Sequence, residues 1–195
     1  MSTGSAGIGV SSHRTAFHVF EPAIGREFRI VSGEQSFTAG GKARKDCLYT
    51  RVGELDAATL ILLNMPGLPM PVVPFLERDD PPLAVGMGVG WLGFPRIHND
   101  LCFFSGRVSA IIDADHFLVD GTPIHSVSGG PAFLATDTGP KIVGSITAYR
   151  PNRLGHDTFP GLSHLTHAAV HRDIAVEIAP DGERRSKVTI TNKLG

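Results

Sequence analysis

The chain has few cysteines and no long apolar run. Its cysteines are Cys47 and Cys102, and its first residues, MSTGSAGIGVSSHR, contain neither a basic region nor an apolar core. This combination favours reduced thiols in a cytoplasmic protein without a secretory signal, with a single disulfide as the alternative. No stretch approaches the roughly 18 uninterrupted apolar residues that cross a bilayer. We therefore expect a soluble protein with no membrane partner.

The chain also lacks an excess of charge of either sign. Its 18 Lys and Arg residues nearly balance 19 Asp and Glu residues, which gives a formal net charge of −1, and no long basic run is present. This balance argues against a nucleic-acid partner. With 195 residues, of which 42% are hydrophobic, the chain is long enough to bury a core without disulfides or metals.

Segments with helical periodicity are scarce, and short runs rich in Val, Ile, Thr and aromatic residues take their place. Turn residues separate these runs, as is typical of β-strands. The runs are 27–31, 47–52, 59–63, 102–112, 116–119, 131–136, 141–149 and 187–191. The pattern predicts a mostly antiparallel barrel or sandwich. One helix is predicted near the C-terminus, in SHLTHAAVHRDI, residues 163–174.

A proline-rich segment predicts how the chain is divided. Residues 66–82, PGLPMPVVPFLERDDPP, contain six prolines, and such a segment resists both a helix and a central strand. We expect it to run extended between two β-lobes. The predicted domains are a first lobe, 1–82, which includes this connector, a second lobe, 83–174, and a C-terminal extension, 175–195, that forms a hairpin.

A glycine motif in the middle of the chain matches a nucleotide-binding pattern only superficially. GVGWLG, Gly88–Gly93, has the form G-x-G-x-x-G, but the dinucleotide fingerprint needs a helix to begin at its third glycine. Phe94 and Pro95 follow at once and break that geometry. We therefore interpret the glycines as tight turns at a strand end, and no cofactor is predicted.

Three histidines follow helical spacing near the C-terminus. His164, His167 and His171 are separated by three and four residues and would share one face of the predicted helix, a possible metal-ligand arrangement. No nearby cysteine or carboxylate completes the ligand set. A solvated or capping helix face is the favoured interpretation, with a metal site as the alternative.

A serine in a glycine-rich bend raises the question of catalysis. HSVSGGPAF, residues 125–133, places Ser128 before two glycines and a proline. Such a serine is either part of an ordinary turn or a nucleophile. Because a serine hydroxyl is a weak nucleophile, catalysis requires a base and an orienting acid. His18, in TAFHV, and Asp56, before the apolar run of LDAATLILL, are the candidates. This order predicts a site between the two lobes.

Three stretches together resemble the trypsin-like (chymotrypsin-fold) serine peptidases, in the style of their compact bacterial members. TAFHV resembles the family's T-A-A-H-[CV], DAATL its D-[IL]-A-L-L, and SVSGGP its G-[DN]-S-G-G-P. Two weaker similarities, VGWLGFP and KIVGSITA, lie at the start of the family's second barrel and in the strand after its nucleophile. The motifs are collinear from about Gly7 to about Leu165.

The resemblance implies a fold and an activity. The fold is all-β, with two six-stranded antiparallel β-barrels and a short helix near the C-terminus. The activity is that of a serine endopeptidase that acts on protein or peptide substrates without a cofactor or metal. Ser128 would attack the carbonyl carbon, His18 would accept its proton, and Asp56 would orient the imidazole. The backbone N–H groups of Ser126 and Ser128 would form the oxyanion hole.

Two positions beside the nucleophile depart from the family's pattern. Ser126 stands where the family has a glycine, and a Cβ in a left-handed backbone costs on the order of 1–2 kcal/mol. A catalytically impaired protease fold that binds peptides or proteins is therefore the alternative function. Val127 stands where the digestive enzymes have an aspartate that pairs with a newly cut amino terminus. We expect no activation by that route.

The resemblance also implies a substrate-binding region. Thr122, six residues before the nucleophile, would lie at the base of the primary pocket. Because Thr122 is uncharged, we expect a neutral residue before the scissile bond rather than Lys or Arg. Thr147, Ala148 and Tyr149 would bind the substrate backbone as an added strand.

Overall fold

The computed structural model describes residues 10–32, 34–41, 47–51, 55–63, 73–77, 79–98, 100–121, 125–171, 174–177 and 187–190. The chain divides into two compact units, Met1–Val72 and Val73–Gly195. Along the chain, the boundary between the two units falls within the proline-rich segment 66–82. The limits of the three predicted domains stay predictions.

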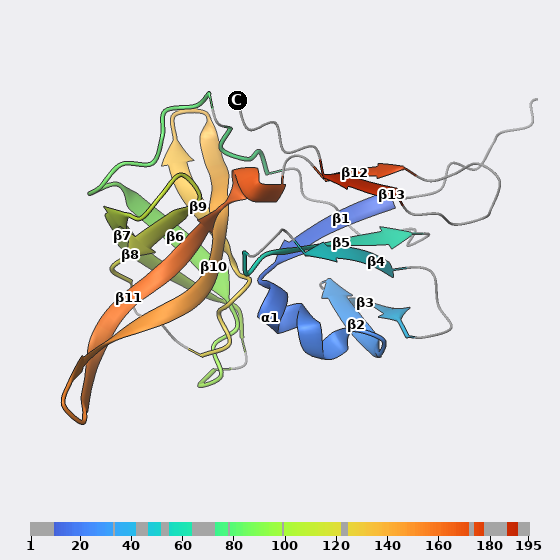
Figure 1. Cartoon of the computed structure of the whole chain (residues 1–195), viewed down its shortest axis with the longest axis horizontal. Helices are drawn as coiled ribbons and strands as arrows, with labels where there is room; N and C mark the ends of the chain where they lie inside the picture. The colour runs from blue at the N-terminus through green and yellow to red at the C-terminus, as the bar shows by residue number, and fades with distance from the viewer. Residues whose placement is uncertain are drawn as a thin grey trace, which may run out of the picture. The chain divides into compact units, whose positions relative to one another are not determined.

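Strands make up most of the described chain (Figure 1). The first unit contains β1 (Val10–Thr15), helix α1 (Phe17–Phe20), a 3₁₀ turn η1 (Glu21–Ala23), β2 (Glu27–Ser32), β3 (Gln35–Gly40), β4 (Cys47–Arg51) and β5 (Ala58–Leu63). The second contains β6 (Gly88–Gly93), β7 (Cys102–Ile111), β8 (His116–Val119), β9 (Pro131–Thr136), β10 (Gly139–Leu154), β11 (Asp157–His167), a 3₁₀ helix η2 (Ala168–His171), β12 (Ile174–Glu177) and β13 (Lys187–Ile190).

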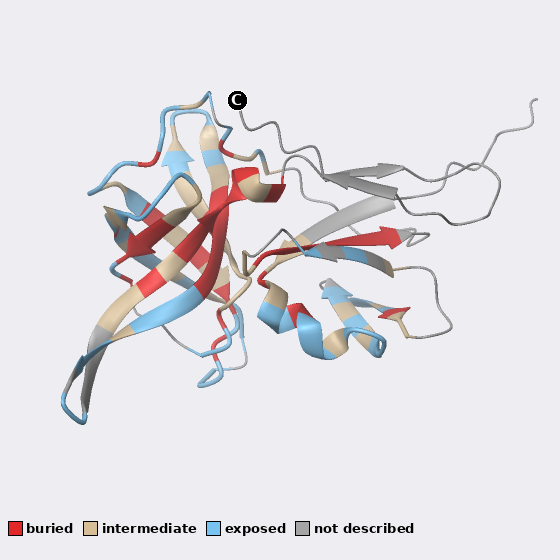
Figure 2. Ribbon diagram, viewed as in Figure 1, coloured by how far each residue is buried: buried red, intermediate tan, exposed pale blue. Residues whose placement is uncertain are grey.

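Six strands of the second unit close into an antiparallel barrel, in the order β10-β11-β8-β7-β6-β9. Burial alternates along β6, so that Val89 and Trp91 face the core while the residues between them do not. Figure 2 shows the buried residues along the barrel strands. Trp91 is the only tryptophan of the chain and is 1% exposed. The prediction of a six-stranded antiparallel barrel is confirmed for this lobe.

The first unit does not show a second barrel in its described residues. Its strands form a three-stranded sheet, in the order β1-β5-β4, and a separate two-stranded sheet, β2-β3. Every pairing is antiparallel. The prediction of two six-stranded barrels thus holds for one lobe, because the five described strands of the other do not close on themselves.

The helix predicted in residues 163–174 is wrong over most of its length. Strand β11 continues to His167 and pairs with β8 up to Thr166 and with β10 up to His167. The η2 that follows is a single 3₁₀ turn. The α-helix that the described residues contain is α1, near the N-terminus. The histidine spacing of three and four residues is typical of a helix, but a short segment can fit the period of a helix or of a strand. Pairing with two neighbouring strands decides in favour of the strand.

The motif Gly88–Gly93 is a strand, not a set of turns, so that interpretation of its glycines is also wrong. The glycines make room for neighbouring side chains. A Cβ on Gly90 would lie 2.3 Å from Cζ of Phe103, whose ring lies across it from β7. Residues 94–98 and 100–121, which follow the motif, contain no helix, whereas the dinucleotide fingerprint requires a helix at its third glycine.

The described part of the proline-rich connector is extended and is hydrogen-bonded to the barrel. The N–H of Leu76 donates to the carbonyl of Ile142 at 2.8 Å, and the N–H of Ile142 donates to the carbonyl of Pro74 at 2.8 Å. These bonds form a parallel bridge between Phe75 and β10. The side chain of Leu76 is 3% exposed and joins the barrel core.

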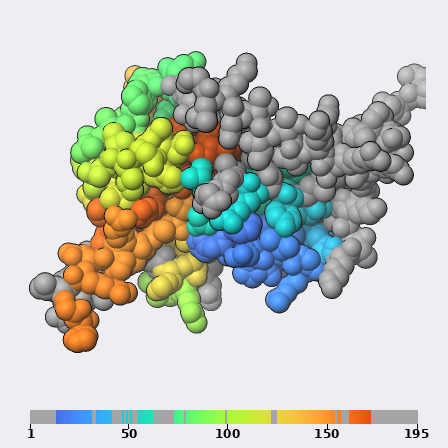
Figure 3. Space-filling model, viewed as in Figure 1, coloured from blue at the N-terminus to red at the C-terminus, as the bar shows by residue number. Residues whose placement is uncertain are grey.

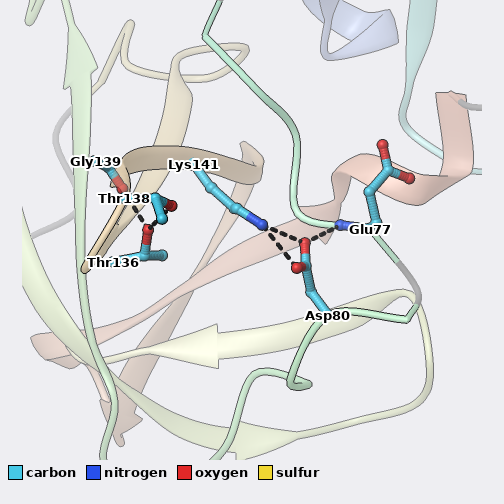
Figure 4. Close-up of polar contacts among 6 residues, drawn as sticks. All are labelled: Glu77, Asp80, Thr136, Thr138, Gly139 and Lys141. Atoms are coloured by element: carbon cyan, nitrogen blue, oxygen red, sulfur yellow. Dashed lines mark hydrogen bonds and ion pairs between the residues drawn. The ribbon is translucent and has the colours of Figure 1, made fainter.

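An ion pair fastens the same segment a few residues later (Figure 4). The Nζ of Lys141, on β10, lies 2.7 and 2.9 Å from the two carboxylate oxygens of Asp80. The same carboxylate accepts the N–H of Glu77 at 2.8 Å. Because both charged side chains are only about one-fifth exposed, at 22% and 21%, this pair is partly shielded from water.

Two hairpin-like features complete the second unit. The ends of β10 and β11, joined through Gly155, extend beyond the barrel as a long two-stranded ribbon (Figures 1 and 3). Strand β12 pairs antiparallel with β13 in the predicted C-terminal extension. Within the described ranges, no helix is long and apolar enough to cross a membrane.

Candidate active site

The register of β1 and β5 brings His18 and Asp56 together. Thr15, the last residue of β1, pairs with Ala58, the first residue of β5. Because the two strands are antiparallel, the residues just after β1 lie beside those just before β5. His18 is on the helix that follows β1, and Asp56 is in the bend that precedes β5.

The carboxylate of Asp56 holds His18 at two points. Its Oδ2 lies 2.6 Å from Nδ1 of the imidazole, and its Oδ1 accepts the backbone N–H of His18 at 2.9 Å. An ionised carboxylate only accepts hydrogen bonds, so Nδ1 carries the hydrogen and Nε2 is left as an acceptor. The two side chains remain accessible, at 49% and 37% exposed. The tautomer with its hydrogen on Nδ1 is the one that a general base needs, because Nε2 can then accept a proton.

Aromatic packing fixes the short helix that carries His18. Phe20 is 7% exposed and lies edge-on to Phe28 at 5.7 Å between ring centroids, with Tyr49 at 5.2 Å. The guanidinium of Arg51 stacks over Phe17 at 4.6 Å. A single helical turn has little stability of its own, so these contacts from β2 and β4 hold it in place.

Ser128 lies in the second unit, on a bend that we name the nucleophile turn, His125–Gly130. The N–H of Gly130 donates to the carbonyl of Val127 at 3.0 Å, which closes a tight turn with Ser128 and Gly129 at its centre. Gly129 has φ 85°, the left-handed value that favours glycine at this turn position. A Cβ on Gly130 would lie 2.0 Å from the Leu92 carbonyl. Each glycine after the serine therefore has a steric reason.

Ser126 adopts a left-handed backbone with φ 75°. No other non-glycine residue among those described has a positive φ. Its side chain is exposed, and that of Ser128 is half-buried. Within the described part of the chain, the N–H groups of Ser126 and Ser128 donate no hydrogen bond. Because neither N–H is used by another described residue, both are available to a bound oxygen.

The predicted substrate-binding residues lie on β10 beyond its pairing with β9. That pairing ends at Ser145, opposite Pro131, and no described strand pairs with this side of Thr147 or Ala148. Ala148 and Tyr149 are exposed, whereas Thr147 is buried at a bulge with its hydroxyl 3.1 Å from that of Thr166. Thr122 lies outside the described residues.

The three C-terminal histidines do not share one face. His164 and His167 lie on strand β11, and His171 ends η2. An odd spacing along a strand places side chains on opposite faces. The ring of His167 is buried and its Nδ1 accepts the N–H of Ala169 at 3.0 Å. Among the described residues, no three His, Cys, Asp or Glu side chains gather as ligands for a metal ion.

Burial lowers the pKa of His164 from its ordinary value of 6.5. The positive charges of Arg150 and His116 lower this pKa further. Both effects disfavour the imidazolium.

One polar residue near the nucleophile turn gave no signal in the sequence. Ser145, in β10, is 6% exposed, and its Oγ makes no hydrogen bond within the described residues. The sequence alone does not show whether a single serine in an apolar strand faces the core or the solvent, so the burial of Ser145 could not be predicted.

Comparison with known proteins identifies the fold. No family model and no curated protein sequence matches the chain. Its structure is similar to that of the Rv3671c protease of M. tuberculosis in its active form, with a TM-score of 0.56 over 82% of this chain at 19% identity. The chain has a protease-like fold. It covers 65% of that protein chain, slightly less than two thirds.

A second structure of the same protease supports this assignment. The inactive form of an M. tuberculosis H37Rv Rv3671c mutant, in which alanine replaces a serine, gives a TM-score of 0.53 at 18% identity. The similarity covers 82% of this chain and 72% of the mutant. At these identities the likeness concerns the fold alone, and it agrees with the trypsin-like resemblance at that level.

Proposed function

We propose that the chain is a serine endopeptidase of trypsin-like type, in which Ser128, His18 and Asp56 form the catalytic triad. The observation that carries this proposal is the two-point contact between Asp56 and His18, which leaves Nε2 free to accept a proton. The protease-like fold supports it. So does the position of Ser128 on a glycine-rich turn beside unpartnered N–H groups.

In the first half-reaction, Oγ of Ser128 attacks the carbonyl carbon of the scissile peptide bond while its proton passes to Nε2 of His18. The carbonyl oxygen becomes an oxyanion, and the carboxylate of Asp56 stabilises the imidazolium. Nε2 then returns the proton to the leaving nitrogen as the C–N bond breaks. The amine product departs, and an ester remains on Ser128.

In the second half-reaction, water attacks the ester carbon and gives a proton to Nε2 of His18. Collapse of this second tetrahedral intermediate breaks the bond to Oγ, which takes the proton back from the imidazolium. The carboxylic acid product leaves, and His18 and Ser128 return to their starting states.

The N–H groups of Ser126 and Ser128 stabilise the oxyanion in both halves. Neither N–H donates to another described residue, so binding the oxyanion breaks no hydrogen bond between described residues. Loss of one such donor raises the barrier by roughly 2.7–4 kcal/mol in other hydrolases. The left-handed φ of Ser126 shows that this residue tolerates the conformation for which the family uses glycine.

The substrate backbone adds as a strand along Thr147, Ala148 and Tyr149. Beyond Ser145, where the pairing of β10 with β9 ends, Thr147 and Ala148 offer the edge for this addition. We propose a neutral residue before the scissile bond, on the basis of Thr122 in the sequence.

The proposal is tested by incubating the purified chain with a peptide library and identifying the cleavage sites by mass spectrometry. Cleavage should be lost in Ser128→Ala and retained in Ser105→Ala, an exposed serine of β7. Strict cleavage after Lys or Arg would refute the proposed specificity. Peptide binding without turnover, unchanged by Ser128→Ala, would instead support the alternative of a peptide-binding module.

A further inference from the structure

The nucleophile turn has one buried side chain, that of Val127. It lies between Ser126, which is exposed, and Ser128, which is half-buried, and is itself 4% exposed. Val127 belongs to the contiguous core cluster of the barrel, together with Trp91 and Ile146. An apolar side chain at this place therefore ties an otherwise polar turn to the protein interior.

Gly93, the last residue of β6, leaves the space that Val127 occupies. A Cβ on Gly93 would lie 2.7 Å from Cγ1 of Val127 and 3.2 Å from its Cα and Cβ. Gly93 is buried, so an added methyl group would have no route to solvent. The fit between these two residues thus depends on the absence of a side chain in β6.

Backbone hydrogen bonds hold the nucleophile turn at both ends and across its tight turn. The N–H of Arg96, just after β6, donates to the carbonyl of His125 at 3.0 Å. At the other end, the N–H of Gly129 donates to the carbonyl of Ile146 at 2.7 Å. Between them, the N–H of Gly130 donates to the carbonyl of Val127 at 3.0 Å, and the side chain of Val127 is buried. The peptide unit between Ser126 and Val127 forms no hydrogen bond within the described residues, so the buried side chain of Val127 is its nearest anchor.

The N–H groups that matter for the proposed reaction lie on two peptide units: that of Ser126 shares a unit with the carbonyl of His125, and that of Ser128 shares one with the carbonyl of Val127. Ser126 has a φ of 75°, which a residue with a Cβ keeps only when its surroundings hold it there. We propose that Val127 is a positioning residue: its anchorage in the gap at Gly93 fixes the left-handed backbone of Ser126 and the directions of the Ser126 and Ser128 N–H groups. The catalytic meaning of this anchor rests on the proposed function.

The chemistry of the anchor has a consequence for regulation. In the digestive enzymes that the sequence resembles, an aspartate at this position pairs with a newly cut amino terminus. Valine has no charge, so it cannot form that ion pair, and its side chain can be buried without a charged partner. The conformation of the nucleophile turn therefore does not depend on an ion pair at Val127.

The test compares Val127→Ala, Gly93→Ala and the double variant with the full wild-type chain. Val127→Ala leaves a gap, and Gly93→Ala pushes the valine out, so each single change should lower kcat by about 10²-fold with KM within about threefold. In the double variant, the new methyl group at position 93 fills part of the gap at position 127. We expect its kcat to recover at least about tenfold over Gly93→Ala.

The matched control is Val119→Ala, the same truncation in the same core cluster but on β8. It should lower the melting temperature, followed by Trp91 fluorescence, as much as Val127→Ala does, and leave kcat and KM unchanged. A fall in kcat as large in Val119→Ala as in Val127→Ala would overturn the proposal, since it would trace the effect to general instability.

A readout without catalysis separates this inference from the proposed function. Amide hydrogen exchange at Gly129 and Gly130 should accelerate by about tenfold in Val127→Ala and stay unchanged in Val119→Ala. Unchanged exchange in both variants would overturn the anchor. If the wild-type chain hydrolyses no peptide, the proposed function fails, and the exchange rates alone decide whether Val127 holds the turn.

Discussion

The carboxylate of Asp56 binds His18 twice, through the imidazole Nδ1 at 2.6 Å and through the backbone N–H at 2.9 Å. The second contact distinguishes the two oxygens of the carboxylate. Oδ1 faces a group that can only donate, and Oδ2 faces a ring nitrogen whose role depends on the tautomer. The arrangement therefore fixes the position of the imidazole and its tautomer together.

Asp56→Asn should reverse this tautomer. The amide oxygen has to take the place of Oδ1, because only an acceptor can face the N–H of His18. The NH₂ group then faces Nδ1 and donates to it, so the ring hydrogen moves to Nε2 and the base is blocked. We expect kcat to fall by about 10⁴-fold at neutral pH. Retention of full activity in a folded Asp56→Asn variant would exclude a role for this carboxylate in catalysis.

Substitution of Ser126 measures the strain of its left-handed backbone. Glycine adopts a φ of 75° without a Cβ penalty, and alanine keeps that penalty but loses the hydroxyl. Ser126→Gly should therefore be more stable than Ser126→Ala by about 1 kcal/mol in urea unfolding. Both variants should keep their activity, because the backbone N–H rather than the hydroxyl contacts the oxyanion. Equal stability of the two would indicate that the native turn is not left-handed at this residue.

The pair of Lys141 and Asp80 should contribute measurably to the stability of the barrel. Lys141→Met leaves a partly shielded carboxylate whose remaining contact is the N–H of Glu77. We expect a loss of about 1–2 kcal/mol, between the values for exposed and buried pairs. Trp91 fluorescence reports this transition, since the only tryptophan lies in the barrel core.

The double variant Lys141→Met with Asp80→Asn is the control for this pair. It should recover part of the lost stability, because it removes the uncompensated charge. Losses that add without recovery would show that the two side chains do not interact in solution.

His164 should make the barrel sensitive to mild acid. Its pKa lies below 6.5 in the folded chain because of burial and the charges of Arg150 and His116. As the pH falls below this ordinary value, the unfolded chain takes up a proton here before the folded chain does. The free energy of unfolding therefore falls as the pH falls through that window. His164→Gln removes this contribution, so its melting temperature should change less than that of the wild type between about pH 7.5 and about pH 5.

Arg150→Gln is the companion variant for this prediction. It removes one of the two neighbouring charges and should also reduce the sensitivity to acid, by less than His164→Gln does. An acid sensitivity that is unchanged in both variants would contradict the assignment to His164.

Local patterns predicted the strands of the barrel better than the polar strands of the first unit. Runs such as 102–112 and 131–136 are rich in β-branched and aromatic residues and form β7 and β9 as expected. Strands β1 (VSSHRT) and β3 (QSFTAG) contain mainly polar or small residues, and no run of β-branched and aromatic residues predicts them. Pairing with apolar neighbours, which only the folded chain reveals, stabilises such strands.

The candidate site was predictable where residue type alone decides the chemistry. The order of His18, Asp56 and Ser128 indicated a triad, and the structure brings the first two into contact. The second contact, through the backbone N–H of His18, depends on how α1 follows β1, and no motif encodes it. The fit of Val127 against Gly93 likewise depends on which residues of the closed barrel face each other.

Active-site labelling tests the central claim most directly. A fluorophosphonate probe should form one covalent adduct per chain, located on Ser128 by mass spectrometry, and the labelling rate should fall steeply in His18→Ala. An adduct on another residue, or labelling of Ser128 at an equal rate in wild type and His18→Ala, would contradict a serine activated by this histidine.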